Sequence, residues 1–533
     1  MYRRELLKFA GTGMAAAVTP AAGAAMGASG EAKGEPATGW LSVRTHGAKG
    51  DGAATDTPAI NRAIEAAAAA GGGTVYFPAG VYLSYSIRLK SKVGLYLDHG
   101  AVILAGPTPL GGTENGGYDA AEPQGAWEPY QDYGHNHWHN SLIWGEGLED
   151  ISISGPGMIW GKGLSRGWEP ARDPERPDAT KPGVGSKAIA LKNCRNVILR
   201  DFKILEGGWF GILATGVDNM TIDNLVIDTN RDGMDIDCCR NVRVSNCAVN
   251  SPWDDGICPK SSFALGYARA TENVTITNCY VTGGYALGAM IDGTWKPVDR
   301  GNHVPTGRIK MGTESNGGFR NITISNCVFE SCRGFAIETV DGALAEDITF
   351  TGITMRDLRS APLFLRLGTR MRGPRDAKPG VLRRVILSNI TCQSSAILPS
   401  ILAGVADHPL EDIRIHDVIV QQAGGGDAAM AALMPEEEAD AYPEPEMFGK
   451  LPATGIFAQH VRNLDVSNVA IETVMPDARA AFWLKDVDGA DFFRVRAPQA
   501  APAFALHDVK KFRSIGSAGI ADTTMESVEE RRI

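Results

Sequence analysis

Three short segments of the sequence contain residues that could do chemistry together. They are Asn230-Arg231-Asp232, Asp254-Asp255 and Arg308-Ile309-Lys310, and Asp232 lies 22 residues before Asp254. Close carboxylates push their pKa values apart, so that one can keep its proton and act as an acid while another acts as a base. Arg308 and Lys310 could hold an anionic group, the arginine through two parallel hydrogen bonds. This set of residues suits hydrolysis of an acidic sugar polymer.

An internal repeat supplies the elements that must bring these segments together. A unit of Asn or Asp followed by alternating apolar residues starts at Asp150, Asn196, Asn219, Asn241, Asn273, Asn321, Asp347, Asp412 and Asn463. Steps between successive starts include 23, 22 and 26 residues. Alternation with a period of two indicates strands with one buried face. A repeat of this length without the leucine-rich frame favours a right-handed parallel β-helix, in which the Asn side chains can form a ladder at a turn.

A second strand is expected in each unit, aligned on Gly211, Gly233, Gly256, Gly307 and Gly334. This alignment points Met234, Ile236, Ile257, Ile309 and Met311 inward and Asp235, Asp237, Lys260, Arg308 and Lys310 outward. Asp232 and Asp255 then fall in register just before the glycine. Neighbouring rungs are about 4.8 Å apart, so these carboxylates can reach the separation of either a retaining or an inverting glycosidase pair.

The sequence therefore predicts an all-β chain built as one single-stranded right-handed parallel β-helix with an N-terminal capping helix. The helix is expected from Thr57 to Ala70, where the composition is helical and three glycines follow. We expect a signal peptide at residues 1–28, a linker at 29–40, the β-helix at 41–515 and a charged C-terminal tail at 516–533.

The N-terminus is typical of a bacterial export signal. The pair Arg3-Arg4 precedes a modest apolar run, and small residues from Ala15 to Ala28 offer cleavage points. It resembles a twin-arginine signal, with an ordinary Sec signal as the alternative. A periplasmic or secreted protein is expected. No later run reaches the ~18 apolar residues of a membrane span.

The net charge argues against certain kinds of partner, and the cysteine content argues against a disulfide-bonded framework. With 62 acidic and 52 basic residues, the net charge of −10 argues against nucleic acid or an anionic membrane as the main partner, though not against an acidic substrate in a local basic pocket. Nine cysteines do not suggest a disulfide framework. Five recur at similar positions in the repeat and are expected as buried thiols: Cys194, Cys247, Cys279, Cys327 and Cys392.

With these motifs, the chain resembles glycoside hydrolase family 28, the polygalacturonase family, over about residues 42–500. The family's ordered motifs are N-T-D, D-D, G-H-G and R-I-K, and this chain has N-R-D at 230–232, D-D at 254–255 and R-I-K at 308–310. The resemblance implies a pectate-lyase-like solenoid that hydrolyses pectin, either galacturonan or rhamnogalacturonan, with inversion. It implies Asp254 as general acid, Asp232 and Asp255 as the groups that activate water, and Arg308 and Lys310 as substrate-binding residues.

One family motif is missing, because Gly284-Tyr285-Ala286 stands where G-H-G is expected. Tyr285 can donate a hydrogen bond but does not titrate near neutrality as histidine does. We count Tyr285, Lys260 and Asp235 as further substrate-binding candidates. An insertion from Asp292 to Thr306 could wall off one end of the cleft and favour exo action, or form a plain surface loop.

Two other clusters allow more than one interpretation. The run His135-Asn136-His137-Trp138-His139 is more typical of a sugar-binding rim or a loop than of a metal site. The basic stretch Arg366, Arg370, Arg372 and Arg375 could extend a subsite for an acidic polymer or lie in a solvated loop.

Two alternatives to a hydrolase remain open at this point. A β-helix polysaccharide lyase would use Ca²⁺ with an Arg or Lys base, and a carbohydrate-binding relative would lack activity. We expect a monomer that acts on an acidic polysaccharide or oligosaccharide without a metal or other cofactor.

Overall fold

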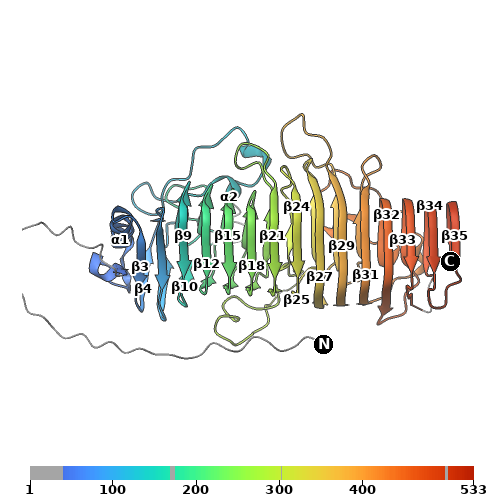
Figure 1. The fold of residues 1–533 in the computed structure, drawn as a ribbon. Helices are drawn as coiled ribbons and strands as arrows, with labels where there is room; N and C mark the ends of the chain where they lie inside the picture. The colour runs from blue at the N-terminus through green and yellow to red at the C-terminus, as the bar shows by residue number, and fades with distance from the viewer. Residues whose placement is uncertain (1–39, 168–174, 300, 302, 499–501) are drawn as a thin grey trace, which may run out of the picture. The chain divides into compact units, whose positions relative to one another are not determined.

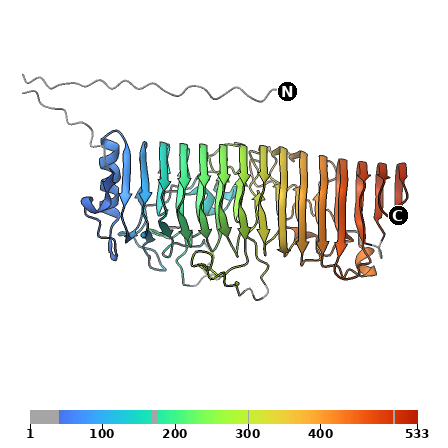
Figure 2. The same ribbon diagram turned by 60° about the horizontal axis from the view of Figure 1, so that its bottom comes forward.

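The computed structural model describes residues 40–533 except 168–174, 300, 302 and 499–501, and in this part the chain winds into a parallel β-helix (Figure 1). The predicted signal peptide and linker lie outside the described residues, apart from Trp40. Each turn of the helix contributes one strand to each of three long faces. Figure 2 shows the strands of successive turns lying side by side along the solenoid.

The first face contains the Asn- and Asp-initiated repeats. Its central strands are β9 (Glu149–Ser154), β12 (Arg195–Arg200), β15 (Asp218–Asp223), β18 (Arg240–Ser245), β21 (Thr271–Thr277) and β24 (Phe319–Ser325). The second face contains β10 (Met158–Trp160), β13 (Lys203–Leu205), β16 (Val226–Asp228), β19 (Ala248–Asn250), β22 (Tyr280–Thr282) and β25 (Val328–Glu330). Both faces continue into longer strands such as β27 (Leu344–Leu358), β29 (Val381–Ser394), β31 (Leu410–Gln422) and β32 (Ala453–Thr473).

The third face contains the segments with candidate chemistry. Its strands are β8 (Ile143–Glu146), β11 (Lys187–Lys192), β14 (Phe210–Thr215), β17 (Asp232–Asp237), β20 (Ile257–Lys260), β23 (Lys310–Met311), β26 (Phe335–Thr339) and β28 (Leu363–Leu367). Ile212 pairs with Met234, Met234 with Ile257, and Ile257 with Ile309. The predicted inward parity is confirmed, since these apolar side chains all lie in the core. The glycine alignment is confirmed for Gly211, Gly233 and Gly256 but is wrong by one residue at Gly307, since Ile257 pairs with Ile309 and Gly256 therefore lies opposite Arg308.

Side-chain ladders run from turn to turn along the first face. Asn219 Nδ2 donates to Asn196 Oδ1 at 2.8 Å, and Asn321 Nδ2 donates to Asn273 Oδ1 at 2.8 Å. These residues have φ near +55°, a region that Asn tolerates better than most side chains. The five recurring cysteines are free, buried thiols. Both the predicted Asn ladder and the predicted thiols are confirmed.

The two ends of the core are closed differently. Helix α1 (Thr57–Ala69) buries Ile60, Ala63 and Ile64 against the first turns, as predicted for a capping helix. At the other end, β35 (Thr523–Arg532) pairs antiparallel with β34 (Phe504–Ile515). The charged stretch expected as a tail thus contains a strand that covers the edge of the last parallel turn, and its charges face outward.

Candidate active site

Three carboxylates meet where β17 and β20 begin. Asp232 is the first residue of β17, and Asp254 and Asp255 directly precede β20. One oxygen from each of the three lies within 4.8 Å of the others. The backbone N–H of Asp255 donates to Asp232 Oδ1 at 3.2 Å and to Asp254 Oδ1 at 3.1 Å. We call Asp232, Asp254 and Asp255 the acid trio.

Glycine permits the close approach of these two turns. A Cβ added at Gly233 would lie 2.3 Å from the backbone oxygen of Gly256. The N–H of Gly233 donates to the carbonyl of Asp255 at 3.0 Å, which holds Asp232 and Asp255 side by side. The Asp-Gly pairs at 232–233 and 255–256 thus bring the two acids opposite each other, rather than simply ending a turn.

Arg308 and Lys310 both bind Asp255. Arg308 Nε donates to Asp255 Oδ1 at 2.8 Å, and Lys310 Nζ lies 2.7 Å from Asp255 Oδ2. The two cations are 1% and 4% exposed, and Asp255 is 1% exposed. The R-I-K motif therefore reaches the acid trio as predicted, but it holds a protein carboxylate in a buried site instead of lying open to solvent.

Arg231, the residue that departs from the family motif N-T-D, binds Asp254. Its Nε and Nη2 lie 3.1 and 2.9 Å from Asp254 Oδ2. The side chain of Asp254 is 27% exposed, whereas Asp232 is 4% exposed as a residue. Asp254 is thus the member of the acid trio that is most accessible from outside.

The three acids have different proton affinities. Burial raises the pKa of Asp232, and the charges of Asp254 and Asp235 raise it further, so its pKa lies well above the ordinary value. Burial also raises the pKa of Asp254, but Arg231, Lys310 and a hydrogen bond with Asp232 together make the net shift downward. For Asp255, Lys310 and Arg308 together outweigh burial and hold the pKa below its ordinary value. Of the three carboxyls, Asp232 is therefore the one whose environment most favours the protonated form.

A second buried polar group adjoins the acid trio on the same face. Lys260 Nζ lies 3.7 Å from Asp235 Oδ2 and 3.1 Å from Glu314 Oε2. His135 Nε2 lies 3.2 Å from the same oxygen of Asp235. Asp235 lies beside Asp232, since one oxygen of each lies within 4.8 Å of the other, and Lys260 joins the group through Asp235. His135 and Glu314 cover both residues. No sequence pattern indicates the His135 contact, because His135 lies 100 residues before Asp235.

Glu338 and Glu444 are functional-site residues that the sequence analysis missed. Glu444 Oε1 accepts from Arg308 Nη2 at 2.7 Å, and its other oxygen accepts from Arg333. Glu338, on β26, is fully buried, and within the described part of the chain neither of its carboxylate oxygens has a hydrogen-bond partner. Burial raises the pKa of Glu338 to about 7, although Lys310 opposes the shift. Glu338 follows the repeat register, whereas Glu444 comes from an insertion that no repeat rule places.

Tyr285 is not brought to the acid trio in the described structure. Its hydroxyl donates to Glu330 Oε2 at 3.0 Å on the second face, and its ring packs edge-on against Trp295 with centroids 5.1 Å apart. From the same insertion, His303 packs against Trp253, the residue before Asp254, with ring centroids 4.4 Å apart. The insertion thus contacts the rim of the site through Trp253, and Arg300 lies outside the described residues.

The clustered histidines and arginines serve separate contacts. His135 joins Asp235, His137 Nδ1 lies 2.8 Å from the carbonyl of Tyr133, and His139 Nε2 lies 2.9 Å from Glu146 Oε2. The three histidines do not converge on one point.

Of the basic stretch, Arg366 donates to the carbonyls of Glu437 and Glu438, Arg370 pairs with Asp341, and Arg372 donates to the carbonyl of Tyr130. These arginines hold loops over the third face, and Arg375 is exposed.

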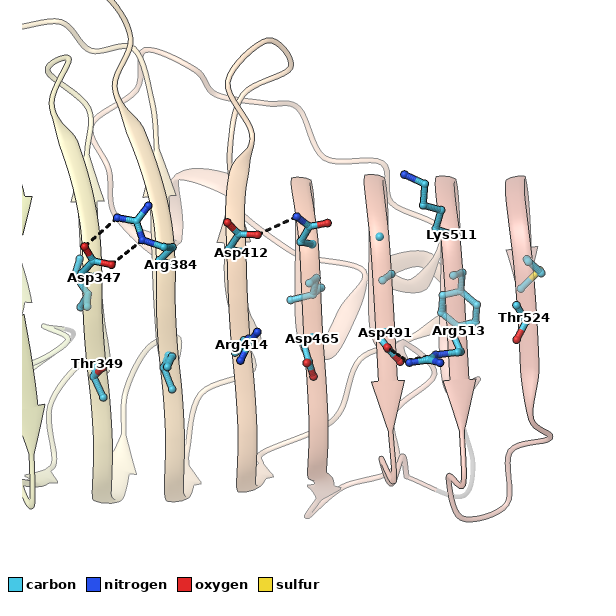
Figure 3. Close-up of a pocket in the computed structure, with 18 of the residues that line it drawn as sticks. Asp347, Thr349, Arg384, Asp412, Arg414, Asp465, Asp491, Lys511, Arg513 and Thr524 are labelled. Carbon is cyan, nitrogen blue, oxygen red and sulfur yellow. Dashed lines mark hydrogen bonds and ion pairs between the residues drawn. The ribbon is translucent and has the colours of Figure 1, made fainter.

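A separate groove of about 990 Å³ lies over the late strands of the first face, from β24 to β35. Figure 3 shows its charged side chains pairing between neighbouring turns. Arg384 Nε lies 2.7 Å from Asp347 Oδ1, and Arg513 Nε lies 3.0 Å from Asp491 Oδ1. These pairs act as cross-strand ladders, and no member of the acid trio lines the groove.

Two family models match parts of the chain. Residues 40–102 match the family described as rhamnogalacturonase A/epimerase, pectate lyase-like, and residues 187–357 match the right handed beta helix region. The second match contains the acid trio and the R-I-K motif. A probable polygalacturonase of Vitis vinifera is 23% identical over 467 residues, which covers 81% of this chain and 86% of that protein.

Solved structures resemble the chain over most of its length. An exopolygalacturonase from Thermotoga maritima has a TM-score of 0.59 at 18% identity, covering 82% of this chain and 92% of its own. A family 28 exopolygalacturonase from Yersinia enterocolitica has a TM-score of 0.59 at 17% identity, covering 84% of this chain and 77% of its own. At such identities the likeness establishes the fold. The fold is a right-handed parallel β-helix.

None of the helices in the described part of the chain has the length and apolar character needed to cross a membrane.

Proposed function

We propose that the chain is a glycoside hydrolase of family 28 that cleaves α-glycosidic bonds in a pectic polysaccharide. The observation that carries the proposal is the acid trio, whose three carboxylates come within 4.8 Å of one another on two adjacent turns. Similarity to the polygalacturonases supports pectin as the substrate class. Their family supports inversion, and the exopolygalacturonase neighbours together with the rim insertion support exo action.

The pKa order of the acid trio suggests how the roles are divided. Asp254 is the member exposed enough to reach a glycosidic oxygen, but in the ligand-free protein it is Asp232 whose pKa is raised and Asp254 whose pKa is lowered. In our proposal, substrate loosens the Arg231 contact, and the proton passes from the carboxyl of Asp232 to the carboxylate of Asp254. Asp254 then protonates the leaving oxygen. Asp232 and Asp255, now both carboxylates, accept a proton from the attacking water, which forms the new bond to the anomeric carbon.

The separation of the carboxylates does not itself argue for inversion. Inverting pairs are usually about 6.5–9.5 Å apart and retaining pairs about 5–5.5 Å. The nearest oxygens of the acid trio are closer than either range. Inversion is therefore proposed from the resemblance, and the anomer that forms first, observed by NMR during hydrolysis, tests it directly.

A Ca²⁺-dependent lyase is the rival function, since three close carboxylates could hold a cation. The charges of this site favour hydrolysis. Arg231, Arg308 and Lys310 already balance the carboxylates, whereas Ca²⁺ sites are built from six to eight oxygen ligands. We propose that the reaction needs no metal.

One digestion separates the alternatives. Polygalacturonan and rhamnogalacturonan are incubated with the protein, with and without a chelator. We expect new reducing ends, no unsaturated product absorbing in the ultraviolet, and no effect of the chelator. An unsaturated product that no longer forms when chelator is present would mean that the protein is a lyase and not a hydrolase. Absence of any product from either polymer would favour another glycan or a carbohydrate-binding role.

We also propose that the protein is exported to the periplasm or beyond through the twin-arginine route and acts as a monomer. The support is Arg3-Arg4 and the small residues that follow. Replacement of both arginines by lysine is expected to leave the protein in the cytoplasm, as detected by cell fractionation. Light scattering of the mature protein reports its oligomeric state.

A further inference from the structure

The two cations of the R-I-K motif already hold a carboxylate from a distant part of the chain. Glu444 lies on residues 435–448, which we call the strap. Its Oε1 is 2.7 Å from Arg308 Nη2 and 3.9 Å from Lys310 Nζ. Its second oxygen accepts from Arg333. This is the arrangement in which basic residues would hold the carboxylate of a uronic acid.

The strap is anchored on both sides of Glu444. Pro443 and Pro445 flank it and are buried, and each proline ring fixes its own φ. The Tyr442 hydroxyl lies 3.1 Å from Thr313 Oγ1, and Glu446 Oε1 accepts from Ser360 Oγ at 2.8 Å. A few residues further along, Phe448 packs on Phe457 with ring centroids 5.8 Å apart. Glu444 is thus presented by a fixed segment rather than by a free loop.

The local charges leave little attraction for a further anion. Arg308, Lys310 and Arg333 face Asp255 and Glu444, and Glu338 lies 3.9 Å from Arg308 Nη2. Three cations therefore face the carboxylates of Asp255 and Glu444 and a third carboxyl, that of Glu338, whose pKa is raised by burial to about 7. Arg308 and Lys310 are also 1% and 4% exposed, so a substrate carboxylate could reach them only by displacing Glu444.

We propose that Glu444 is a specificity-determining residue. Its carboxylate occupies the position beside the acid trio where the carboxylate of a substrate would bind, so that this subsite accepts a neutral sugar. The preferred substrate is then a polymer in which a neutral sugar alternates with a uronic acid, instead of an all-uronate chain. This inference rests on the proposed glycosidase function and narrows its substrate.

The test compares the wild-type protein with Glu444→Gln on two oligosaccharides. One is an all-galacturonate oligomer and the other alternates galacturonate with rhamnose. We expect the wild type to have the higher kcat/KM on the alternating oligomer. Glu444→Gln should raise kcat/KM on the all-galacturonate oligomer at least about tenfold relative to the alternating one, because a charge-assisted hydrogen bond becomes available to the substrate.

Glu436→Gln is the matched control, because it removes the same charge from an exposed position of the strap that has no described contact to Arg308 or Arg333. It should leave the ratio of the two kcat/KM values unchanged. An equal change for both strap variants, or no change of the ratio in Glu444→Gln, would overturn the inference. Thermal unfolding of both variants checks that the strap stays folded.

Binding of trigalacturonate, measured by calorimetry in an Asp254→Asn background, separates this inference from the proposed function. A gain in affinity of about tenfold on Glu444→Gln, with no turnover of any pectic oligomer by the protein with Asp254 intact, would keep the inference and overturn hydrolysis. Turnover without any gain in affinity or change in the ratio would keep hydrolysis and overturn the inference.

Discussion

Arg231 places both Nε and Nη2 against the same oxygen of Asp254, at 3.1 and 2.9 Å. This contact joins the one departure within the N-R-D segment to the proposed general acid. It lowers the pKa of Asp254 against the effect of burial, whereas burial and the charges of Asp254 and Asp235 raise the pKa of the adjacent Asp232. In the proposed mechanism, Arg231 therefore makes catalysis depend on a proton transfer from Asp232 that a threonine at this position would not require.

Replacement of Arg231 by glutamine should raise the pKa of Asp254, because an opposite charge close to a carboxylate lowers its pKa by about 1–3 units. An acid with a higher pKa stays protonated to higher pH. We therefore expect the alkaline limb of the kcat/KM profile to move upward by about one pH unit. Arg243→Gln, which removes an arginine bound to Asn219 and Thr221 on the first face, should leave the profile in place. An unchanged alkaline limb in Arg231→Gln would mean that the Arg231 contact does not govern the proton that the acid trio donates.

Substrates with different leaving groups distinguish the roles within the acid trio. Asp254→Asn should lower kcat on pectic oligomers by at least about 10³-fold, because no proton reaches the leaving oxygen. An activated aryl glycoside needs little protonation, so Asp254→Asn should recover much of its activity on that substrate. Asp255→Asn should have a low kcat on both substrates, since Asp255 acts on the attacking water. Recovery by Asp255→Asn instead of Asp254→Asn would exchange the two roles.

Lys310 should contribute to stability as well as to the site. Lys310→Met leaves the buried carboxylate of Asp255 with Arg308 as its remaining close cation, and breaking a buried ion pair costs about 3–5 kcal/mol. We expect the free energy of unfolding in urea to fall by an amount of this order. Lys511→Met removes a lysine whose side chain is 69% exposed and which pairs with Asp488, so its effect should stay below about 1 kcal/mol. Equal effects of the two substitutions would contradict the buried pairing.

The repeat made much of the fold and part of the site predictable. Alternating apolar residues placed Asp232, Asp255 and Lys310 on one face, because strand parity and rung stacking act locally, although the glycine alignment was one residue off at Gly307. Contacts made by insertions followed no such rule. Glu444 reaches Arg308 across 136 residues, and His135 reaches Asp235 across 100. The predicted outward face was therefore right in direction but wrong in exposure, since two insertions cover it.

Glu338 gives the site a pH dependence of stability that can be measured without substrate. Its pKa of about 7 in the folded protein, against an ordinary value of 4.5, means that the folded state holds its proton longer than the unfolded state. Stability must then fall as pH rises from about 4.5 to about 7 and stay level above that, by about 3 kcal/mol in total. Glu338→Gln has no proton to lose, so it should lack this contribution.

The measurement is the free energy of unfolding of the wild type and of Glu338→Gln at pH 5 and pH 8. Glu338→Gln should gain about 2–3 kcal/mol relative to the wild type on going to pH 8, because the wild type must there ionise a buried carboxyl that makes no hydrogen bond to any described residue. Glu526→Gln, at an exposed position of β35, controls for loss of one acid and should show no such pH-dependent gain. A difference between wild type and Glu338→Gln that is the same at both pH values would mean that Glu338 is already ionised at pH 5, held so by Arg308 and Lys310 more strongly than burial opposes it.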